Sequence, residues 1–529
     1  MGYLLHQLIS ENAAAHPDNE AVVFKERSIS YAELETETNR LAQGLHHLGV
    51  TNGDRVGIYM NRSIESIVSI FGVLKAGATY IPVDPLCPPD RLNYMVNKCD
   101  IKYLLTVDNK LGRVKPAFPT NCPLNSIIVM KGKAGDSAAF GTTQVVAWES
   151  FSKQFSGEAV QTATIETDIA YILFTSGSTG NPKGVMLSHL NALTFVNTAH
   201  EFFHIKPGDR FSNICPLHFD MSVVDLYVAF KAGATVVILP ETDALFPLKI
   251  AEYIENQKIT VWNSVPSALS ILAAFKDLEQ YDLSSLRLIL FAGERFPLKY
   301  LRRLKELIGD ARFCNMYGQT EANSSLYYWV DELPESGTVS LPIGKAFPNF
   351  EAFALDSDGN RIDSPGTEGE LYVRASTVAY GYWGEPEKTK NAFVVNPLQP
   401  DLREHVYKTG DLVQLDDQGN FVFLGRKDHM IKSRGYRIEI GEIEAVLCSH
   451  PEIENAIVIP IPDELIGNRL TALVVRSPKS QIKKHDAVLY CSHQLPKYMI
   501  PETIEFRDAF PKTSSGKVDR KKLSETLLN

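Results

Sequence analysis

Small, hydroxyl-bearing and basic residues are concentrated in the stretch YILFTSGSTGNPKGVMLSH, residues 171–189. The apolar run from Ile172 to Phe174 predicts a buried strand that leads into the polar part. The ten residues from Thr175 to Gly184 hold four Ser or Thr, three Gly and one Lys. Glycine lets backbone N–H groups approach an anion, hydroxyls donate hydrogen bonds, and lysine adds positive charge. This composition favours a loop that binds a polyphosphate, with a surface turn rich in small residues as the alternative.

Several well-known motifs do not occur in the sequence. No Gly-x-Gly triplet is found among the 34 glycines, which excludes the dinucleotide-binding fingerprint. No Gly-Lys pair has a glycine five positions earlier, so there is no Walker A loop. The Gly-x-Ser-x-Gly elbow of α/β-hydrolases does not occur either. We therefore expect a nucleotide enzyme with a different kind of phosphate loop.

Alternating strands and helices have to position this loop. Ser30 and Glu33 form a capping-box signal before a helical run of leucines. Strand patterns at 55–60 and 79–83 enclose a second helix, which Ser63 caps. Strand, helix and strand at this spacing predict βαβ units and a largely parallel sheet.

One five-residue sequence occurs twice, as Lys75 to Thr79 and as Lys231 to Thr235. Both copies read KAGAT, end a helical pattern and open an apolar strand. Coincidence between similar helix-to-strand turns is the alternative, but the matching flanks favour a duplicated α/β layer.

The pattern changes at about Asn349. Short strand patterns alternate there with turn signals at 358–360, 364–366 and 417–420, which indicates a small β-rich unit. Beyond about Asp428 the chain predicts a compact α+β domain of about a hundred residues, with a basic end. We expect an α/β fold with a large N-terminal domain, residues 1–427, made of two similar α/β layers plus the β-rich unit. A small, mobile α+β C-terminal domain, residues 428–529, would follow.

Composition and charge narrow the class of protein. The 529 residues are 44% hydrophobic and 22% charged, and the formal net charge of -10 gives no electrostatic footprint for nucleic acid or anionic lipid. Seven cysteines without a Cys-x-x-Cys pair favour free thiols in a reducing cytoplasm. No stretch approaches the ~18 apolar residues of a membrane span, and no signal peptide is recognisable. A cytoplasmic protein with no nucleic-acid or membrane partner is predicted.

Taken together, several stretches resemble the adenylate-forming superfamily of acyl-CoA synthetases, firefly-type luciferases and nonribosomal-peptide adenylation domains. The similarity covers essentially the whole chain, in the order known from that superfamily. It implies that ATP activates a carboxylic acid as its acyl-adenylate, and that the small domain rotates about Asp428. The stretches are residues 171–189, NMYGQTE at 315–321, YKTGD at 407–411, GRKD at 425–428, SRGYRIE at 433–439 and PKTSSGKVDR at 511–520.

The resemblance also implies residue roles. Lys517 would bridge the substrate carboxylate and the α-phosphate, Glu321 would bind Mg²⁺, and Tyr317 would stack on adenine, beside Asn315. Asp411 would accept hydrogen bonds from the ribose hydroxyls, with Arg426 assisting. Taken singly, each could be structural instead: a core aromatic, a turn residue or part of a solvated charged segment. The full set implied for ATP and its phosphates is Thr175, Ser176, Gly177, Ser178, Thr179, Gly180, Lys183, Gly293, Glu294, Asn315, Met316, Tyr317, Gly318, Thr320, Asp411 and Arg426.

The acid to be activated is expected to be a small amino acid. Asp220 matches the acidic residue that pairs with the substrate α-amine in amino-acid-activating members, and an ammonium partner resolves the cost of a carboxylate in an apolar pocket. Capping of the following helix is the alternative for Asp220. L-proline is the first choice, because the stretches 216–227 and 291–297 are similar to free-standing L-prolyl ligases. The remaining pocket positions implied are Met221, Val224, Asn263, Leu290, Ala292, Met316, Ser324 and Ser325.

The acceptor of the activated acid is expected to be the phosphopantetheine thiol of a separate peptidyl carrier protein. The chain ends nine residues after Arg520, with no carrier domain following, so loading in trans is expected. A CoA ligase for a small carboxylic acid is the alternative, since Gln319 stands where carrier-loading members usually have Pro and is found in acyl-CoA ligases. A non-catalytic binding protein on the same fold is disfavoured by the intact Lys517, Glu321 and Asp411.

Overall fold

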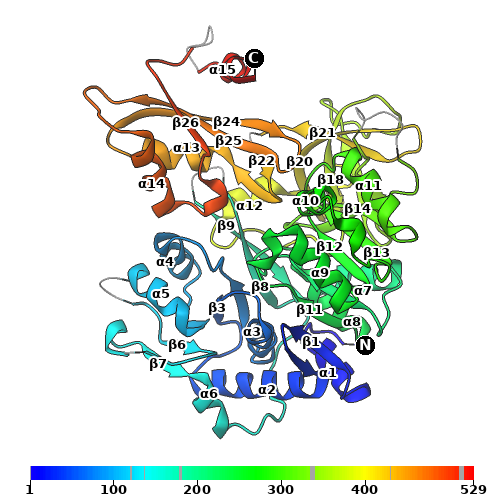
Figure 1. Ribbon diagram of the computed structural model, residues 1–529, viewed down its shortest axis with the longest axis vertical. Helices are drawn as coiled ribbons and strands as arrows, with labels where there is room; N and C mark the ends of the chain where they lie inside the picture. The colour runs from blue at the N-terminus through cyan, green and yellow to red at the C-terminus, as the bar shows by residue number, and fades with distance from the viewer. Residues whose placement is uncertain are drawn as a thin grey trace.

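A computed structural model describes residues 2–118, 122–135, 137–177, 181–333, 340–428, 430–511 and 518–528. The chain runs from two α/β layers at one end of the molecule, through a β-rich unit, to a C-terminal part at the other end (Figure 1). No helix in the described part of the chain is long and apolar enough to cross a membrane. The seven cysteines are free.

The first layer is a seven-stranded sheet in the order β7-β6-β5-β3-β4-β8-β9. Neighbouring strands are parallel except for β9, which is antiparallel to β8. The polar stretch that begins at Thr175 therefore connects β8 to β9, the last two strands at one edge of this sheet. The strands are β3 (Arg55–Tyr59), β4 (Thr79–Pro82), β5 (Tyr103–Thr106), β6 (Ser126–Val129), β7 (Gln144–Ala147), β8 (Ile169–Thr175) and β9 (Lys183–Ser188).

The second layer is a nine-stranded sheet in the order β16-β15-β14-β13-β12-β10-β11-β1-β2. Its centre, from β14 to β1, is parallel, while β2, β15 and β16 add antiparallel edges. The expectation of two largely parallel α/β layers is thus confirmed. The strands are β1 (Glu20–Phe24), β2 (Arg27–Ser30), β10 (Arg210–Asn213), β11 (Thr235–Ile238), β12 (Val261–Ser264), β13 (Leu288–Ala292), β14 (Arg312–Gln319), β15 (Asn323–Trp329) and β16 (Lys345–Ala346).

Helices pack between and around the sheets, and one hydrophobic cluster takes residues from both layers. The predicted caps are present: Ser30 and Ser63 each form a capping box at the start of α2 and α3. The helices of this part are α1 (Gln7–Ala15), α2 (Tyr31–His47), α3 (Ile64–Lys75), α4 (Pro89–Lys98), α5 (Leu111–Ala117), α6 (Trp148–Phe151), α7 (His189–Phe202), α8 (Ala229–Ala232), α9 (Pro247–Gln257), α10 (Pro266–Ala274) and α11 (Leu298–Ile308).

The repeated KAGAT sequence occupies the same kind of position in both layers. Gly77, with φ 75°, lies between α3 and β4, and Gly233, with φ 71°, lies between α8 and β11. Both glycines adopt the left-handed conformation that ends a helix at low steric cost. The repeat therefore marks equivalent helix-to-strand turns of two similar α/β layers.

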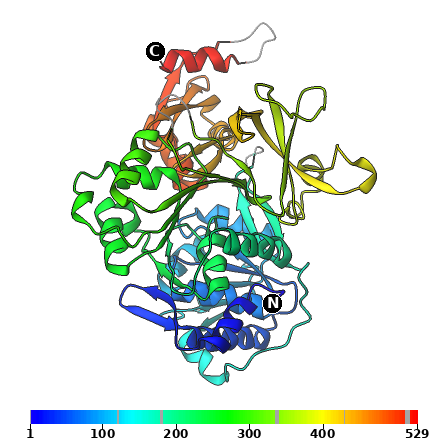
Figure 2. The ribbon, with the colours of Figure 1, turned by 90° about the vertical axis from the view of Figure 1, so that its right-hand side faces the viewer.

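The β-rich unit and the C-terminal part complete the fold. Figure 2 shows the β-rich unit projecting to one side of the molecule, below the C-terminal helix. Its sheet pairs β17 (Glu351–Leu355), β18 (Gly369–Arg374), β20 (His405–Leu415) and β19 (Phe393–Val395), and β21 (Phe421–Arg426) adds to β20; α12 is Pro386–Ala392. The predicted domain boundary after residue 427 falls between β21 and the hairpin of β22 (Met430–Ser433) and β23 (Tyr436–Glu439).

The C-terminal sheet has the order β24-β25-β26 and is covered on both faces. Alternate side chains of its strands pack on α13 and α14 on one face and on α15 on the other, as expected for a sheet with two buried faces. The elements are α13 (Ile440–Cys448), β24 (Ile453–Asp463), β25 (Gly467–Arg476), α14 (Lys484–Gln494), β26 (Thr503–Arg507) and α15 (Arg520–Leu528).

Candidate active site

The loop predicted to bind phosphate, called the phosphate loop below, begins where β8 ends. The hydroxyl of Thr175 is buried and has no partner among the described residues. Gly177 is required there, because a Cβ atom would lie 2.1 Å from the carbonyl oxygen of Asn181. Ser178, Thr179 and Gly180, which we predicted to bind phosphate, lie outside the described residues.

Glu321 is a fully buried carboxylate at the centre of a cluster of charges. Lys183, at the start of β9, lies 3.2 Å from Oε1, and Arg437, from β23, lies 3.0 Å from Oε2. The Tyr382 hydroxyl donates to Oε1 at 2.8 Å and accepts from Nζ of Lys183 at 2.9 Å. Burial would raise the pKa of Glu321, but the two cations and the phenol outweigh it and hold that pKa well below its usual value. Burial also lowers the pKa of Lys183, an effect that Glu321 partly offsets.

The C-terminal part supplies further contacts to the same region. Glu442 of α13 pairs with Arg91 of α4 at 2.6 Å, and its other oxygen accepts from the backbone N–H of Gly177 at 3.4 Å. The Ser176 hydroxyl donates to the carbonyl of Arg437 at 2.9 Å. The hairpin β22–β23 and α13 therefore lie directly on the phosphate loop.

Gly293 and Glu294, both predicted to bind ATP, follow β13. Gly293 has φ 99°, a conformation that favours glycine. Glu294 accepts from the backbone N–H of Ser267 at 3.1 Å and from that of Gly435, at the turn of the β22–β23 hairpin. In this arrangement Glu294 therefore anchors the hairpin.

The predicted adenine and ribose residues come together from β14, β20 and β21. The Tyr317 hydroxyl donates to Oδ2 of Asp411, and Arg426 donates to Oδ1. Both Tyr317 and Asp411 are buried. Arg426 also pairs with both oxygens of Asp428, the predicted hinge residue, at 2.6 Å each. The nucleotide residues are thus linked to the predicted hinge by one guanidinium.

Other nucleotide residues occupy β14 itself. The Asn315 side chain donates to the carbonyl of Pro342 at 2.9 Å, and Met316 is fully buried. Gly318 is required because a Cβ atom would lie 1.9 Å from the carbonyl oxygen of Asn323.

Asp220, predicted to pair with a substrate amine, follows β10 and is half-buried. The Thr320 hydroxyl donates to its Oδ2 at 3.1 Å. No described cation lies within ion-pair distance of it, and burial raises the pKa of Asp220. Thr320 is next to Glu321 in the chain, so the two predicted acidic groups lie in one continuous site.

Four of the eight residues predicted to line the pocket beside Asp220 lie on three neighbouring parallel strands. Asn263 pairs in register with Leu290, and Ala292 with Met316, across β12, β13 and β14. The antiparallel strand β15 adds Ser324 opposite Gly318. Met221, Val224, Leu290, Ala292 and Met316 belong to one hydrophobic cluster. The register therefore sets Leu290 beside Asn263 and Ala292 beside Met316. The Ser325 hydroxyl bonds to the local backbone carbonyls of Ala322 and Asn323.

Asn263 is fully buried, and its side-chain amide is already engaged. It donates to Oδ1 of Asp225 at 2.7 Å and to the carbonyl of Met221 at 3.1 Å. Asp225 is fully buried and also accepts from Asn213 at 3.1 Å. Burial raises the pKa of Asp225 to about 7. Asn263 thus links the predicted pocket to a second buried acid, Asp225, which was not among the predicted pocket residues.

Lys517, predicted to be catalytic, lies outside the described residues. The residue that follows it, Val518, packs with Ile457 and Leu473 on the face of the C-terminal sheet that α15 covers. The opposite face carries α13, whose Glu442 contacts the phosphate loop. Figure 1 shows α15 at the far end of the molecule from the two large sheets.

Sequence reasoning did not single out Tyr382, Arg437, Glu442 or Asp225 as site residues. Arg437 lies within a stretch that carried the family resemblance, and Asp225 follows Met221 by one helical turn, so weak signals existed. The contacts of Tyr382 and Glu442 span 61 and 265 residues of sequence, and no local pattern indicates them.

One metal-binding spacing in the sequence is not realised in the fold. His200-Glu201-Phe202-Phe203-His204 has the His-Glu-x-x-His spacing that binds zinc when both histidines lie on one helix. Helix α7 ends at Phe202, and His204 adopts φ 50° beyond it. Within the described ranges, no group of three His, Cys, Asp or Glu side chains could hold a metal.

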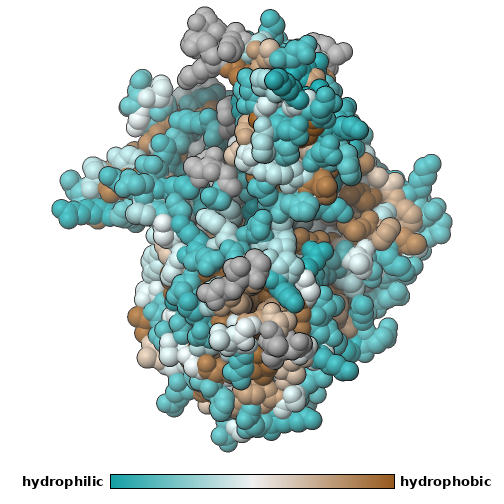
Figure 3. All heavy atoms as spheres, turned by 90° about the vertical axis from the view of Figure 1, so that its left-hand side faces the viewer, coloured by the Kyte–Doolittle hydropathy of each residue, from teal (hydrophilic) through white to brown (hydrophobic). Residues whose placement is uncertain are grey.

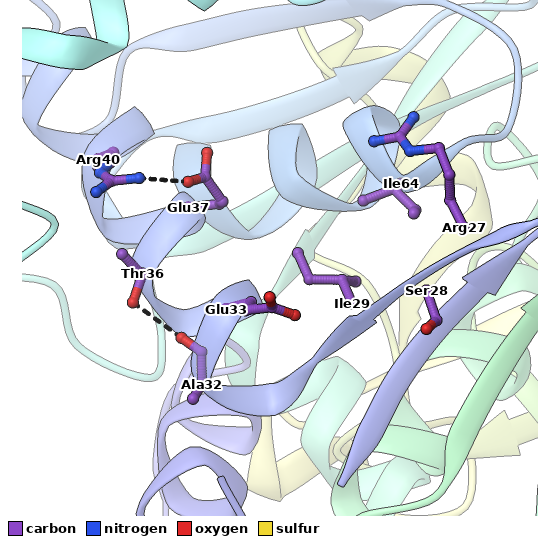
Figure 4. Close-up of a pocket in the computed structure, with 9 residues that line it drawn as sticks. All are labelled: Arg27, Ser28, Ile29, Ala32, Glu33, Thr36, Glu37, Arg40 and Ile64. Carbon is purple, nitrogen blue, oxygen red and sulfur yellow. Dashed lines mark hydrogen bonds and ion pairs between the residues drawn. The ribbon is translucent and has the colours of Figure 1, made fainter. Parts of the chain in front are cut away.

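Three hollows lie outside this site. The first, of about 610 Å³, is lined by residues of α7 and by Gly2, Tyr3 and Pro348. Two more are smaller. One, of about 490 Å³, lies between β2 and the start of α2, and its polar groups bond to each other, as in the pair Arg40–Glu37 (Figure 4). The other, of about 400 Å³, separates Leu86 and Arg113 from Leu495 and Lys497 of the C-terminal part. The face that carries α4, α5 and α14 is mostly hydrophilic, with apolar residues in scattered patches (Figure 3). None of the predicted site residues lines any of the three hollows.

Comparisons with known proteins identify the family. The model of the AMP-binding enzyme family matches residues 9–383, and that of the AMP-binding enzyme C-terminal domain matches residues 442–517. An L-proline--[L-prolyl-carrier protein] ligase of Pseudomonas fluorescens is 36% identical over 98% of both chains. Tyrocidine synthase 1 of Brevibacillus parabrevis is 32% identical, and the chain spans 45% of that protein. The crystal structure of IdnL1 superposes with a TM-score of 0.79 at 28% identity, covering 97% of this chain and 99% of that one.

The chain therefore belongs to the AMP-binding enzyme family, the adenylate-forming superfamily that the motifs indicated. It is an AMP-forming acid–thiol ligase that uses ATP.

Proposed function

We propose that this ligase activates a small amino acid, L-proline in the first place, as aminoacyl-AMP and transfers it to the phosphopantetheine thiol of a separate peptidyl carrier protein. The observation that carries the proposal is the environment of Asp220. This carboxylate has the Thr320 hydroxyl as a partner at 3.1 Å and is next to a largely apolar set of residues. A carboxylate in such surroundings is stabilised by a cationic ligand, and the α-ammonium of an amino acid provides one.

The size of the substrate is inferred from the pocket residues. Met221, Val224, Leu290, Ala292 and Met316 present apolar side chains, and Asn263 is engaged by Asp225. A small aliphatic side chain or ring fits a lining of this kind, because it brings no polar group that the apolar side chains would leave unpaired. The 36% identical relative that is an L-proline--[L-prolyl-carrier protein] ligase supports proline and a carrier protein.

The first half-reaction needs positioning more than acid–base chemistry. The substrate carboxylate is ionised at neutral pH and attacks the α-phosphorus of ATP, with pyrophosphate as the leaving group. The phosphate loop and Lys183 would hold the leaving phosphates, Asp411 the ribose and Tyr317 the adenine. Lys517 would stabilise negative charge on the attacking carboxylate and the α-phosphoryl oxygens.

The carboxylate of Glu321 itself fits a magnesium ion, although its present neighbours include two cations. Mg²⁺ in such sites takes one or two carboxylates and completes its shell with phosphate oxygens and water, and Glu321 is a buried carboxylate beside the phosphate loop. Bound there, Mg²⁺ would neutralise charge on the leaving pyrophosphate. In the arrangement described, both oxygens of Glu321 accept from Arg437, at 3.2 and 3.0 Å. Arg437 has to withdraw before this carboxylate can bind a metal.

The domain arrangement therefore suits the second half-reaction, in which the carrier thiol attacks the acyl-adenylate and AMP leaves. Arg437 supplies the positive charge at Glu321, and Glu442 accepts from the Gly177 N–H that would otherwise face a phosphate. These contacts are compatible with a site from which pyrophosphate has left. The C-terminal part would rotate about Asp428 between this arrangement and one that brings Lys517 to the substrate.

Amino-acid-dependent ATP–pyrophosphate exchange tests the proposal. The panel would contain the proteinogenic amino acids, pipecolate and several fatty and aryl acids. Exchange that peaks with L-proline is expected. A peak with another amino acid would retain the role of Asp220 and reject proline, and exchange only with acids that lack an amine would reject both.

The second candidate is a CoA ligase for a small carboxylic acid. It is favoured by Gln319, which stands where carrier-loading members of the family usually have Pro. Release of AMP in the presence of CoA alone would support it. Release that requires a phosphopantetheinylated carrier protein is expected.

A further inference from the structure

Gln319 lies between the adenine segment and Asp411. It is the last residue of β14 and is 6% exposed. Its Nε2 donates to Oδ2 of Asp411 at 2.6 Å and to the hydroxyl of Tyr317 at 2.7 Å. The side chain therefore touches both residues that would hold the nucleoside.

The orientation of this amide follows from its neighbour. An ionised carboxylate only accepts hydrogen bonds, so the amide has to turn its NH₂ group toward Asp411. Its Oε1 is buried and has no partner among the described residues. Because buried acceptors are normally paired, the unpaired Oε1 indicates that the contact with Asp411 sets the position of this side chain.

Asp411 is held from two sides. Oδ2 accepts from Gln319 and from the Tyr317 hydroxyl, while Oδ1 accepts from Arg426. A carboxylate offers about four acceptor positions, so these three donors decide which direction stays open to a ligand hydroxyl. Removing one donor frees the carboxylate to turn.

We propose that Gln319 is a positioning residue for the nucleotide, which holds Asp411 in the orientation that accepts from the ribose hydroxyls. It thereby contributes to the preference for ATP over deoxyribonucleotides. The inference rests on the role given above to Asp411. It assigns a function to a side chain at which this protein departs from the pattern of carrier-loading relatives.

The test compares ATP, 2′-deoxy-ATP and 3′-deoxy-ATP in the exchange reaction, with the best amino acid held at saturation. Gln319→Leu keeps the size of the side chain and removes the donor. Gln418→Leu, at an exposed glutamine of the β20–β21 turn, is the matched control. Melting temperatures would verify that each variant is folded.

For Gln319→Leu we expect kcat/KM for ATP to fall about tenfold, as for loss of a hydrogen bond to a charged group. Activity with the deoxynucleotides should fall much less, so the preference for ATP shrinks, and the KM of the amino acid should stay unchanged. If the wild type does not distinguish the three nucleotides, the role of Asp411 is wrong. If the wild type distinguishes them and Gln319→Leu does so equally well, the role of Gln319 is wrong.

Discussion

The two carboxylates of the site, Glu321 and Asp220, have opposite surroundings. Glu321 is fully buried, yet Lys183, Arg437 and Tyr382 compensate its charge and lower its pKa. Asp220 is less buried, and its side-chain donor is the neutral Thr320 hydroxyl at 3.1 Å. Burial raises its pKa, an effect that Thr320 and the more distant charge of Lys432 only partly offset. The phosphate side of the site therefore has cations in direct contact with its carboxylate, whereas no described cation lies at ion-pair distance from Asp220. This difference is what an enzyme that handles a polyanion and a cationic amino acid requires.

The largest effect is expected for Lys517→Ala, because this lysine would act where the two sides meet. Adenylation should fall by about 10²–10³, as when a group that stabilises the charge of a transition state is lost. Thioester formation from supplied aminoacyl-AMP should be spared. Exchange kinetics and a single-turnover transfer assay would measure the two steps, and equal losses would refute this separation of roles.

Asp220→Asn tests the acid-binding side. Removal of one member of a desolvated ion pair costs about 3–5 kcal/mol, which corresponds to a fall of about 10²–10³ in kcat/KM for proline. Cyclopentanecarboxylate, the analogue without an amine, should lose little. Thr320→Val, which removes the hydroxyl partner of Asp220, should cost about 1 kcal/mol with ATP held at saturation. Equal losses for proline and its analogue would show that Asp220 does not recognise the amine.

Arg437→Met tests whether Arg437 stabilises the domain arrangement in which it pairs with Glu321. Loss of hydrogen bonds to a charged group should weaken this arrangement by about 1.5–3 kcal/mol, so transfer to the thiol should slow by about 10–100-fold. Adenylation should change little. Arg434→Met, on the same hairpin and paired at the surface with Glu502, is the control. A larger loss in adenylation than in transfer would assign Arg437 to the first half-reaction.

Among these variants, Asp225→Asn should change catalysis the least. Its main effect should be on how the free energy of unfolding depends on pH. Asp225 has its pKa raised to about 7, against about 3.9 in an unfolded chain. The folded state therefore holds the proton more tightly, and the stability linked to Asp225 is complete below about pH 4 and is lost as the pH rises through 7.

Urea unfolding between about pH 4 and 8 measures this pH-dependent part of the free energy of unfolding. The wild type should lose up to about 4 kcal/mol relative to Asp225→Asn over the whole range of titration. Asp277→Asn, at an exposed aspartate, should show the same pH dependence as the wild type. Parallel pH dependences of the wild type and Asp225→Asn would mean that Asp225 is ionised throughout.

Local features were predictable where the reason for them is local. The caps at Ser30 and Ser63, the turns at Gly77 and Gly233, and the alternation of strands and helices follow from backbone geometry and periodicity within about ten residues. Resemblance then indicated which segments converge, and the structure brings Tyr317, Asp411 and Arg426 together as expected. The roles of the predicted site residues remain predictions.

The sequence by itself determined the family, the α/β layers and the residue types available for chemistry, because these depend on motifs that are contiguous in the chain. The tertiary structure alone decided how charges are compensated. It pairs Glu321 with Arg437 across 116 residues, engages Asn263 with Asp225, and sets Gln319 against Asp411 across 92 residues. The pKa of a buried group depends on which donors and charges lie within a few ångströms of it. Such neighbours come from distant parts of the chain, so only the folded arrangement reveals them.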